Sequence, residues 1–357
     1  MRFQKKTSYR ADIRLFEYRR DALWYAALVL ALAAVPLVAD DYMLRQFSFV
    51  FIYGIAGVGL MLLSGFTGLL SLGHAAFLAV GAYAAAILQP LGVDFSIVLV
   101  VSAALSAAFG IAVGLPALRL YGIYLAIATL AFAFIAEQVI GRWESLTRGH
   151  KGIFVKAPVL FGVPLGAGWM FYLMALVIVV LATLAARNLL RTPTGRAMIA
   201  IRDSETAARS MGVNVAWVKT QAFAISAAYA GIAGALLAHS FRFVSPAQFT
   251  VGVSIELLIL VFIGGVGSLR GAHLGAIFVV MLPQAVAVLK DYLPAGLSGL
   301  SGLQSAIFGL ALLLFILFEP GGLNALWLRI RFYLEAFPLY RRDSFRRQRS
   351  FAKGERW

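Results

Sequence analysis

The sequence predicts an all-α, polytopic integral membrane protein, a helix bundle with about ten spans. Of its 357 residues, 61% are hydrophobic and 13% are charged, whereas a soluble domain averages roughly 45–50% and 25%. The apolar residues fall in long runs, and a helix needs roughly 20 of them to cross a bilayer. Of the 31 Lys and Arg residues, 21 lie in 1–20, 187–215 and 321–357, beside such runs, which is typical of the cytoplasmic side.

The apolar runs define the predicted spans in chain order. These are 22–39, 48–64, 69–89, 96–118, 121–141, 167–186, 217–240, 251–268, 271–290 and 301–319. The first run is followed by Asp40-Asp41 and not by a small-residue cleavage site, so we expect an uncleaved span. The Gly-rich stretch 64–88 is compatible with a re-entrant or broken helix.

The distribution of positive charge predicts the orientation. Ten spans place both termini on one side of the membrane. With the termini in the cytoplasm, 24 basic residues lie inside and seven outside, four of these seven in the loop 142–166. This asymmetry predicts a multi-pass membrane protein with cytoplasmic termini. A basic N-terminal tail (1–21) would then precede the spanning domain (22–320), and a basic C-terminal tail (321–357), either amphipathic on the inner leaflet or solvated, would follow it.

The spans carry little that could drive transport or catalysis. Apart from Glu319 at the last position of a span, the acidic residues inside predicted spans are Glu137 and Glu256, and both lie near the outer ends of their spans. An ion relay through the bilayer centre is therefore poorly supported. The G-x-x-x-x-G-K-[ST] phosphate loop is absent, so the chain is not expected to be an ATPase or any other enzyme. Cysteine is absent and the four histidines have no metal-ligand spacing, so no catalytic residue, metal or cofactor is expected.

These absences leave two classes of protein, a permease driven by a partner ATPase and a stand-alone facilitator or channel. The net charge of +15 does not predict nucleic-acid binding, because the basic residues flank apolar runs, and contact with anionic lipid accounts for them.

The longest internal loop, 187–216, has the pattern of a helix–turn–helix. Pro193 opens one expected helix, and Asp203 or Ser204 is placed to cap a second. Gly212 would end that second helix in the left-handed conformation. Such an element fits the docking of a partner ATPase, and an ordinary connection between spans is the alternative.

The same loop resembles a known motif. Glu205-Thr206-Ala207-Ala208 followed by Gly212 is similar to the E-A-A-x-x-x-G loop of ABC-importer permeases, which docks into the ATPase subunit. Thr206 replaces the first alanine, and the I-x-L-P that follows the glycine in that motif is missing. The resemblance implies ATPase docking by Arg202, Asp203, Glu205, Ala207, Ala208 and Gly212.

Three further segments, 65–83, 196–203 and 254–271, resemble the LivM-type permeases of branched-chain amino acid ABC importers. The resemblance covers about residues 45–320. It implies a pathway subunit for branched-chain amino acids or related small solutes, although urea, short-chain amide and aromatic amino acid importers have the same permease type. It also implies a second permease, identical or homologous, two cytoplasmic ATPases and a periplasmic solute-binding protein as partners.

The polar residues of the spans are the candidates for the pathway. Ser71 and His74 share one helix face because they are three residues apart, and they either line the cavity or bond across a helix interface. Glu256 and Glu137, near the outer ends of their spans, either meet the substrate or pair with a neighbouring helix. A set of glycines is expected to be structural, in turns and close helix contacts: Gly65, Gly68, Gly73, Gly264, Gly265, Gly267 and Gly271.

Overall fold

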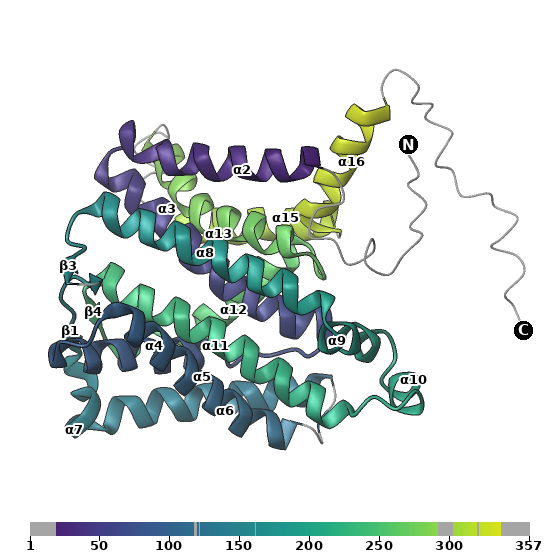
Figure 1. The fold of residues 1–357 in the computed structure, drawn as a ribbon, viewed down its shortest axis with the longest axis horizontal. Coiled ribbons are helices and arrows are strands. Elements are labelled where there is room, and N and C mark those ends of the chain that lie inside the picture. Colours follow the sequence, from purple (N-terminus) through teal and green to yellow (C-terminus); the bar gives the residue numbers. More distant parts are fainter. Residues whose placement is uncertain are drawn as a thin grey trace, which may run out of the picture.

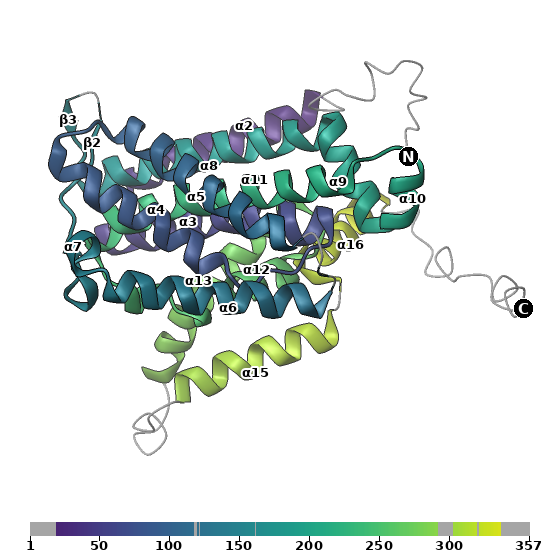
Figure 2. The same cartoon turned by 90° about the horizontal axis from the view of Figure 1, so that it is seen from below.

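The computed structural model describes residues 19–117, 120, 122–160, 162–291, 303–319 and 321–336. Most of the long helices lie side by side along one direction (Figure 1, Figure 2). They are α2 (Arg19–Ala34), α3 (Asp41–Leu60), α4 (His74–Leu88), α5 (Phe95–Ala117), α6 (Ile123–Arg142), α8 (Gly168–Arg191), α11 (Val215–Phe241), α12 (Val251–Gly264), α13 (Leu269–Asp291) and α15 (Leu303–Phe318). The last helix, α16 (Gly322–Ala336), runs steeply across this direction at one end of the bundle (Figure 1). The predicted all-α bundle is confirmed.

Eight helices among the described residues are long and apolar enough to cross a membrane, and they contain α3, α4, α5, α6, α8, α11, α12 and α13. Each matches one predicted span. The predicted first and last spans correspond to α2 and α15, which have 16 residues each, and their crossing stays a prediction. Most of the two predicted basic tails lies outside the described residues, although α16 begins where an amphipathic segment was expected.

Short elements gather at the two ends of the bundle (Figure 1, Figure 2). At one end are α9 (Pro193–Asp203) and α10 (Glu205–Ser210). At the other are α7 (Glu144–Thr147) and two antiparallel strand pairs, β1 (Ile153–Phe154) with β4 (Phe243–Val244) and β2 (Val159–Leu160) with β3 (Val163–Pro164). The remaining turns are η1 (Val35–Leu37), η2 (Met61–Gly65), η3 (Gln89–Leu91), η4 (Gly149–Lys151) and η5 (Pro246–Gln248). The segments predicted to lie outside and inside the cell therefore occupy opposite ends.

The Gly-rich stretch contains a break between two helices, as the sequence indicated. The π-helical turn η2 extends α3 to Gly65. Gly68 then has a φ of +77°, a value that costs most side chains energy but not glycine. The next helix begins at His74, so the predicted span 69–89 starts five residues too early. Gly73 lies against α6, where an added methyl group would be 2.6 Å from the Thr129 carbonyl oxygen.

The central helix of the bundle is α11, which packs against α3, α4 and α5. Small residues bring the backbones together: a methyl group added at Gly234 would lie 2.0 Å from the Leu78 carbonyl oxygen, and one at Gly81 would lie 2.2 Å from the Gly231 carbonyl oxygen. Inside a membrane, close packing and interhelical hydrogen bonds hold helices together, because lipid is as apolar as the side chains. The α4–α11 contact therefore depends on glycine.

Gly234→Ala should weaken the bundle because the added methyl group must push α4 and α11 apart. We expect a cost of about 1–3 kcal/mol, the usual cost of overpacking, seen as a lower melting temperature of the detergent-solubilised protein. The control is Gly309→Ala in α15, where an added methyl group meets no atom within 4 Å. Equal melting temperatures for the two variants would contradict this account of the contact.

Candidate functional site

The helices α9 and α10 form an elbow that projects from the bundle between α8 and α11 (Figure 1). The Thr192 hydroxyl accepts a hydrogen bond from the Gly195 N–H (3.3 Å) and caps α9. The Ser204 hydroxyl accepts one from the Ala207 N–H (3.3 Å) and caps α10. Of the two predicted caps, Ser204 is confirmed, and Asp203 is instead the last residue of α9.

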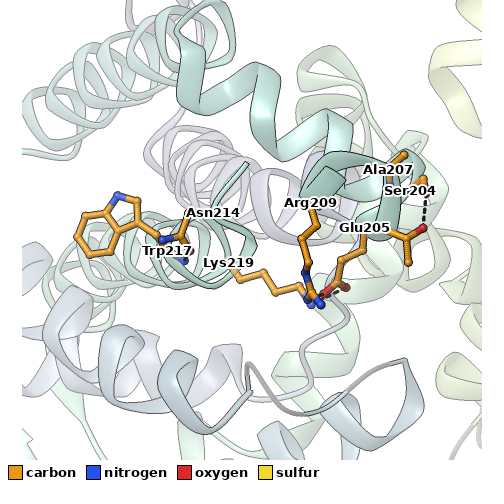
Figure 3. Close-up of polar contacts among 8 residues, drawn as sticks. Ser204, Glu205, Ala207, Arg209, Asn214, Trp217 and Lys219 are labelled. Atoms are coloured by element: carbon orange, nitrogen blue, oxygen red, sulfur yellow. Dashed lines mark hydrogen bonds and ion pairs between the residues drawn. The ribbon is translucent and has the colours of Figure 1, made fainter. Parts of the chain in front are cut away.

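The elbow ends as its sequence predicts. Gly212 follows α10 with a φ of +84°, the left-handed conformation that glycine favours. The Asn214 side chain then accepts a hydrogen bond from the Trp217 N–H (3.1 Å) and caps α11 (Figure 3). Every helix start in this segment has a side-chain cap, so the elbow is a defined helix–turn–helix and not an irregular connection.

An ion pair holds the elbow to the bundle (Figure 3). The Lys219 ammonium, on the first turns of α11, donates to the Glu205 carboxylate at 2.7 Å, and the Lys219 side chain is only 4% exposed. Arg209 approaches the same carboxylate at 3.4 Å, but its side chain is 66% exposed, so it contributes little. Glu205 therefore faces the bundle and fixes the position of α10.

Ala208 also faces inward. It belongs to a small apolar core under the elbow, with Leu63, Leu69, Leu125, Met198, Ile201, Val215, Val218, Ala222 and Phe223. Ala207, Arg209 and Met211 are exposed instead, and Met211 is 85% exposed. The candidate docking residues thus face two ways. Ala207 and Gly212 lie on the outer surface, whereas Glu205 and Ala208 contact the bundle and keep α10 in place.

Arg202 lies at the junction of the elbow and the break between α3 and α4. Its guanidinium donates to the Asp203 carboxylate from two nitrogens (3.0 and 2.9 Å) and to the Gly65 carbonyl oxygen (3.2 Å). Arg202 and Asp203, two of the six residues predicted to take part in docking, therefore form hydrogen bonds within the chain. Arg202 joins two segments that are 137 residues apart.

Ser71 and His74 lie in a buried polar network. The Ser226 hydroxyl donates to the Gly59 carbonyl oxygen (2.7 Å), so it has no second hydrogen and must accept from His74 Nε2 (2.7 Å). His74 Nδ1 then accepts from the Ser71 hydroxyl (3.0 Å). Both side chains are 0% exposed. The prediction that Ser71 and His74 share a helix face is wrong, because Ser71 lies in the break before α4, which begins at His74. Of the two predicted roles, the contacts are those of bonding across a helix interface, here between α3, α4 and α11.

The two span carboxylates lie near the end of the bundle that carries the strand pairs. Glu256, near the start of α12, accepts a hydrogen bond from the Tyr53 hydroxyl on α3 at 3.4 Å. Glu137 lies near the end of α6, and no hydrogen bond or ion pair of the described residues joins it to Glu256. The placement near the outer ends of the predicted spans is confirmed, and the contact with Tyr53 joins Glu256 to a neighbouring helix.

The glycines of the α12–α13 turn make a sharp reversal. Gly265 and Gly267 have φ values of +107° and +80°. A methyl group added at Gly264 would lie 2.0 Å from the Gly271 carbonyl oxygen. These residues have the structural role that the sequence predicted, because only glycine allows the two helices to meet so closely at the turn.

Residues 42–317 of the chain match the family model described as "Branched-chain amino acid transport system / permease component". The chain belongs to this permease family. No solved structure matches the chain.

Three curated relatives illustrate the range of this permease family. The chain is 36% identical to the high-affinity branched-chain amino acid transport system permease protein LivM of Escherichia coli, over 79% of this chain and 72% of the relative. It is 27% identical to the probable branched-chain amino acid transport permease protein LivM of Methanocaldococcus jannaschii, over 63% and 68%. It is 31% identical to the autoinducer 2 import system permease protein LsrC of Salmonella paratyphi B, over 42% of each chain.

Several contacts of this permease were not predicted from its sequence. Lys219 entered the sequence analysis only as one of the 24 basic residues counted on the inner side, yet it is the buried partner of Glu205. The hydroxyls of Ser226 and Ser254 were missed, although the latter accepts from the Ala75 N–H at 2.9 Å and ties α12 to α4. Isolated serines on apolar helices were the available signal, because such hydroxyls bond across helix interfaces.

Removing the Glu205 charge should loosen the elbow. Glu205→Gln leaves the buried Lys219 ammonium without its carboxylate. We expect a local cost of about 1–2 kcal/mol, less than for a fully buried pair because Glu205 is 22% exposed. Hydrogen–deuterium exchange in 204–214 should then accelerate about tenfold. Arg209→Gln, which removes the exposed partner of the same carboxylate, is the control, and equal acceleration in both variants would refute the assignment.

Proposed function

We propose that this permease forms the translocation pathway of an ATP-driven ABC importer and that the α9–α10 elbow is where the ATPase docks. The observation that carries the proposal is the elbow itself, capped at each helix start and held to α11 by the Glu205–Lys219 pair. Ordering such a segment costs conformational entropy. A mechanical contact with an ATPase gives a reason for this rigidity, and the membership of the permease family supports it.

The proposed substrates are branched-chain amino acids or related small solutes. The name of the Escherichia coli relative, a high-affinity branched-chain amino acid permease, supports this class. The autoinducer 2 permease is similar over a smaller part of the chain, so it supports the importer type more than the solute. Importers of urea, short-chain amides or aromatic amino acids are the alternatives within the same permease type.

The proposed partners divide the work. Two cytoplasmic ATPases supply the energy, a second permease completes the pathway, and a periplasmic binding protein delivers the solute. The described spans fit a subunit without its own energy source, because Glu137 and Glu256 lie near one end of the bundle and away from the bilayer centre. ATP-driven closure of the ATPases would displace the elbows and switch the side on which the pathway opens.

The proposed orientation places the elbow in the cytoplasm and the strand pairs in the periplasm, with both termini inside the cell. The positive-inside rule supports it, because Arg187, Arg191, Arg196, Arg202 and Arg209 all lie in or beside the elbow. The bundle would lie in the inner membrane.

Met211→Glu should release the ATPase while the permease stays folded. Met211 is 85% exposed on the elbow, so the new charge costs the permease little but would be buried unpaired against the ATPase. We expect at least about a tenfold loss of ATPase that copurifies with the detergent-solubilised permease. Phe154→Glu, an exposed apolar residue (81%) at the opposite end, is the control. Undiminished copurification of Met211→Glu would count against docking at the elbow.

Thiol labelling tests the orientation, and the chain contains no cysteine of its own. Ser210→Cys in the elbow and Lys156→Cys near the strand pairs both place a thiol at an exposed position. In cells with a permeabilised outer membrane, a membrane-impermeant maleimide should label only Cys at 156. After lysis it should label both. Labelling at position 210 before lysis would place the elbow outside and end the docking proposal.

A further inference from the structure

The end of α3 leaves backbone carbonyl groups that need hydrogen-bond donors, because a helix that stops cannot satisfy its own last carbonyls. The Thr67 hydroxyl donates to the Leu62 carbonyl oxygen (2.9 Å), and the Leu69 N–H donates to that of Leu63 (3.1 Å). These two donors come from the break itself. Gly65 differs, because the described donor to its carbonyl oxygen is Arg202 of the elbow.

Three glycines form the slot through which the Arg202 side chain reaches that carbonyl. A methyl group added at Gly68 would lie 3.3 Å from Arg202 Cγ, and one added at Gly267 would lie 3.1 Å from Arg202 Nη1. At Gly65 an added methyl group would lie 2.8 Å from the Gly267 backbone nitrogen. Arg202 therefore touches the end of α3, the break and the α12–α13 turn at once.

A small cavity lies on one side of this junction. It has a volume of about 100 Å³ and is lined in part by Thr67, Leu120, Arg202, Glu205 and Lys219. On the other side of the break, His74 is fully buried and bonded to Ser71 and Ser226. The junction thus has room to move next to the elbow, while the start of α4 is held by α11.

We propose that Arg202 is a positioning residue that couples the elbow to the break between α3 and α4, so that displacement of the elbow moves Gly65 and the α12–α13 turn. This inference rests on the proposed ATPase docking. The cation suits the place, because the negative end of the α3 dipole lies there. Arg202 is a residue of α9 itself, so a shift of α9 is passed through its guanidinium to the Gly65 carbonyl oxygen.

The test uses the complete transporter in liposomes, with this chain, the partner permease, the ATPases and the binding protein. Solute uptake and ATP hydrolysis are measured together. For Arg202→Gln we expect hydrolysis within about twofold of wild type and about a tenfold loss of solute carried per ATP, the factor that ~1.4 kcal/mol gives. Arg202→Lys, which keeps a donor for Gly65, should recover most of the ratio.

The control is Arg242→Gln, which removes an equal charge at the opposite end of the bundle. The Arg242 guanidinium donates to the Gly166 carbonyl oxygen (3.3 Å), so this variant also loses a bond to a backbone carbonyl but should leave the ratio unchanged. If Arg202→Gln lowers only the melting temperature and leaves solute per ATP unchanged, Arg202 is merely a helix cap and the inference fails. If the wild-type chain binds no ATPase, the proposed function fails instead, and the two failures are distinct.

A disulfide supplies the rescue experiment. A methyl group added at Gly68 would lie 3.6 Å from Arg202 Cβ, within the roughly 3.5–4.5 Å that a disulfide requires. In Gly68→Cys/Arg202→Cys the oxidised bond should replace the hydrogen bond as the link, so oxidised transporter should carry several times more solute per ATP than the same sample after reduction. Equal ratios in oxidised and reduced samples whose cross-linking is verified by mass spectrometry would overturn the inference.

Discussion

A helix that ends inside a membrane protein must have hydrogen-bond donors for its last carbonyl groups, since lipid offers none. The break after α3 meets this constraint with two donors of its own and one from Arg202 on α9. The interior of the bundle and its external elbow are therefore parts of one hydrogen-bonded structure. Without the break, the elbow would pack on an uninterrupted helix and would have no backbone group to hold.

The polar groups of the bundle are arranged to join helices more than to bind ions. Ser71, His74 and Ser226 donate their polar hydrogens to each other and to the Gly59 carbonyl oxygen. An ion relay would need side chains that face a pathway, whereas these three are fully buried between helices. This arrangement fits the proposal that ATPases outside the membrane supply the energy for transport.

Local patterns in the sequence predicted the local structure well, but the contacts between distant segments could not be predicted from such patterns. Ser204, Gly212 and Pro193 act within a few residues, so their roles follow from spacing. Lys219 meets Glu205, and Arg202 meets Gly65, only because α9, α10 and α11 pack on the end of α3. Ala208 matched the docking motif by its position, but which way its side chain points depends on the core beneath it.

The motif and the structure together assign different tasks to residues that stand next to each other. Ala207 and Ala208 are alike as side chains, yet one is exposed and the other is buried against the bundle. Successive residues of a helix point in different directions, so an elbow that docks a partner as proposed presents one alanine outward and the next to the bundle. Under this proposal a bulky side chain outside would obstruct docking, and a bulky side chain inside would lift α10 away from Lys219. The proposed docking would thus explain the repeated alanine by two separate steric limits.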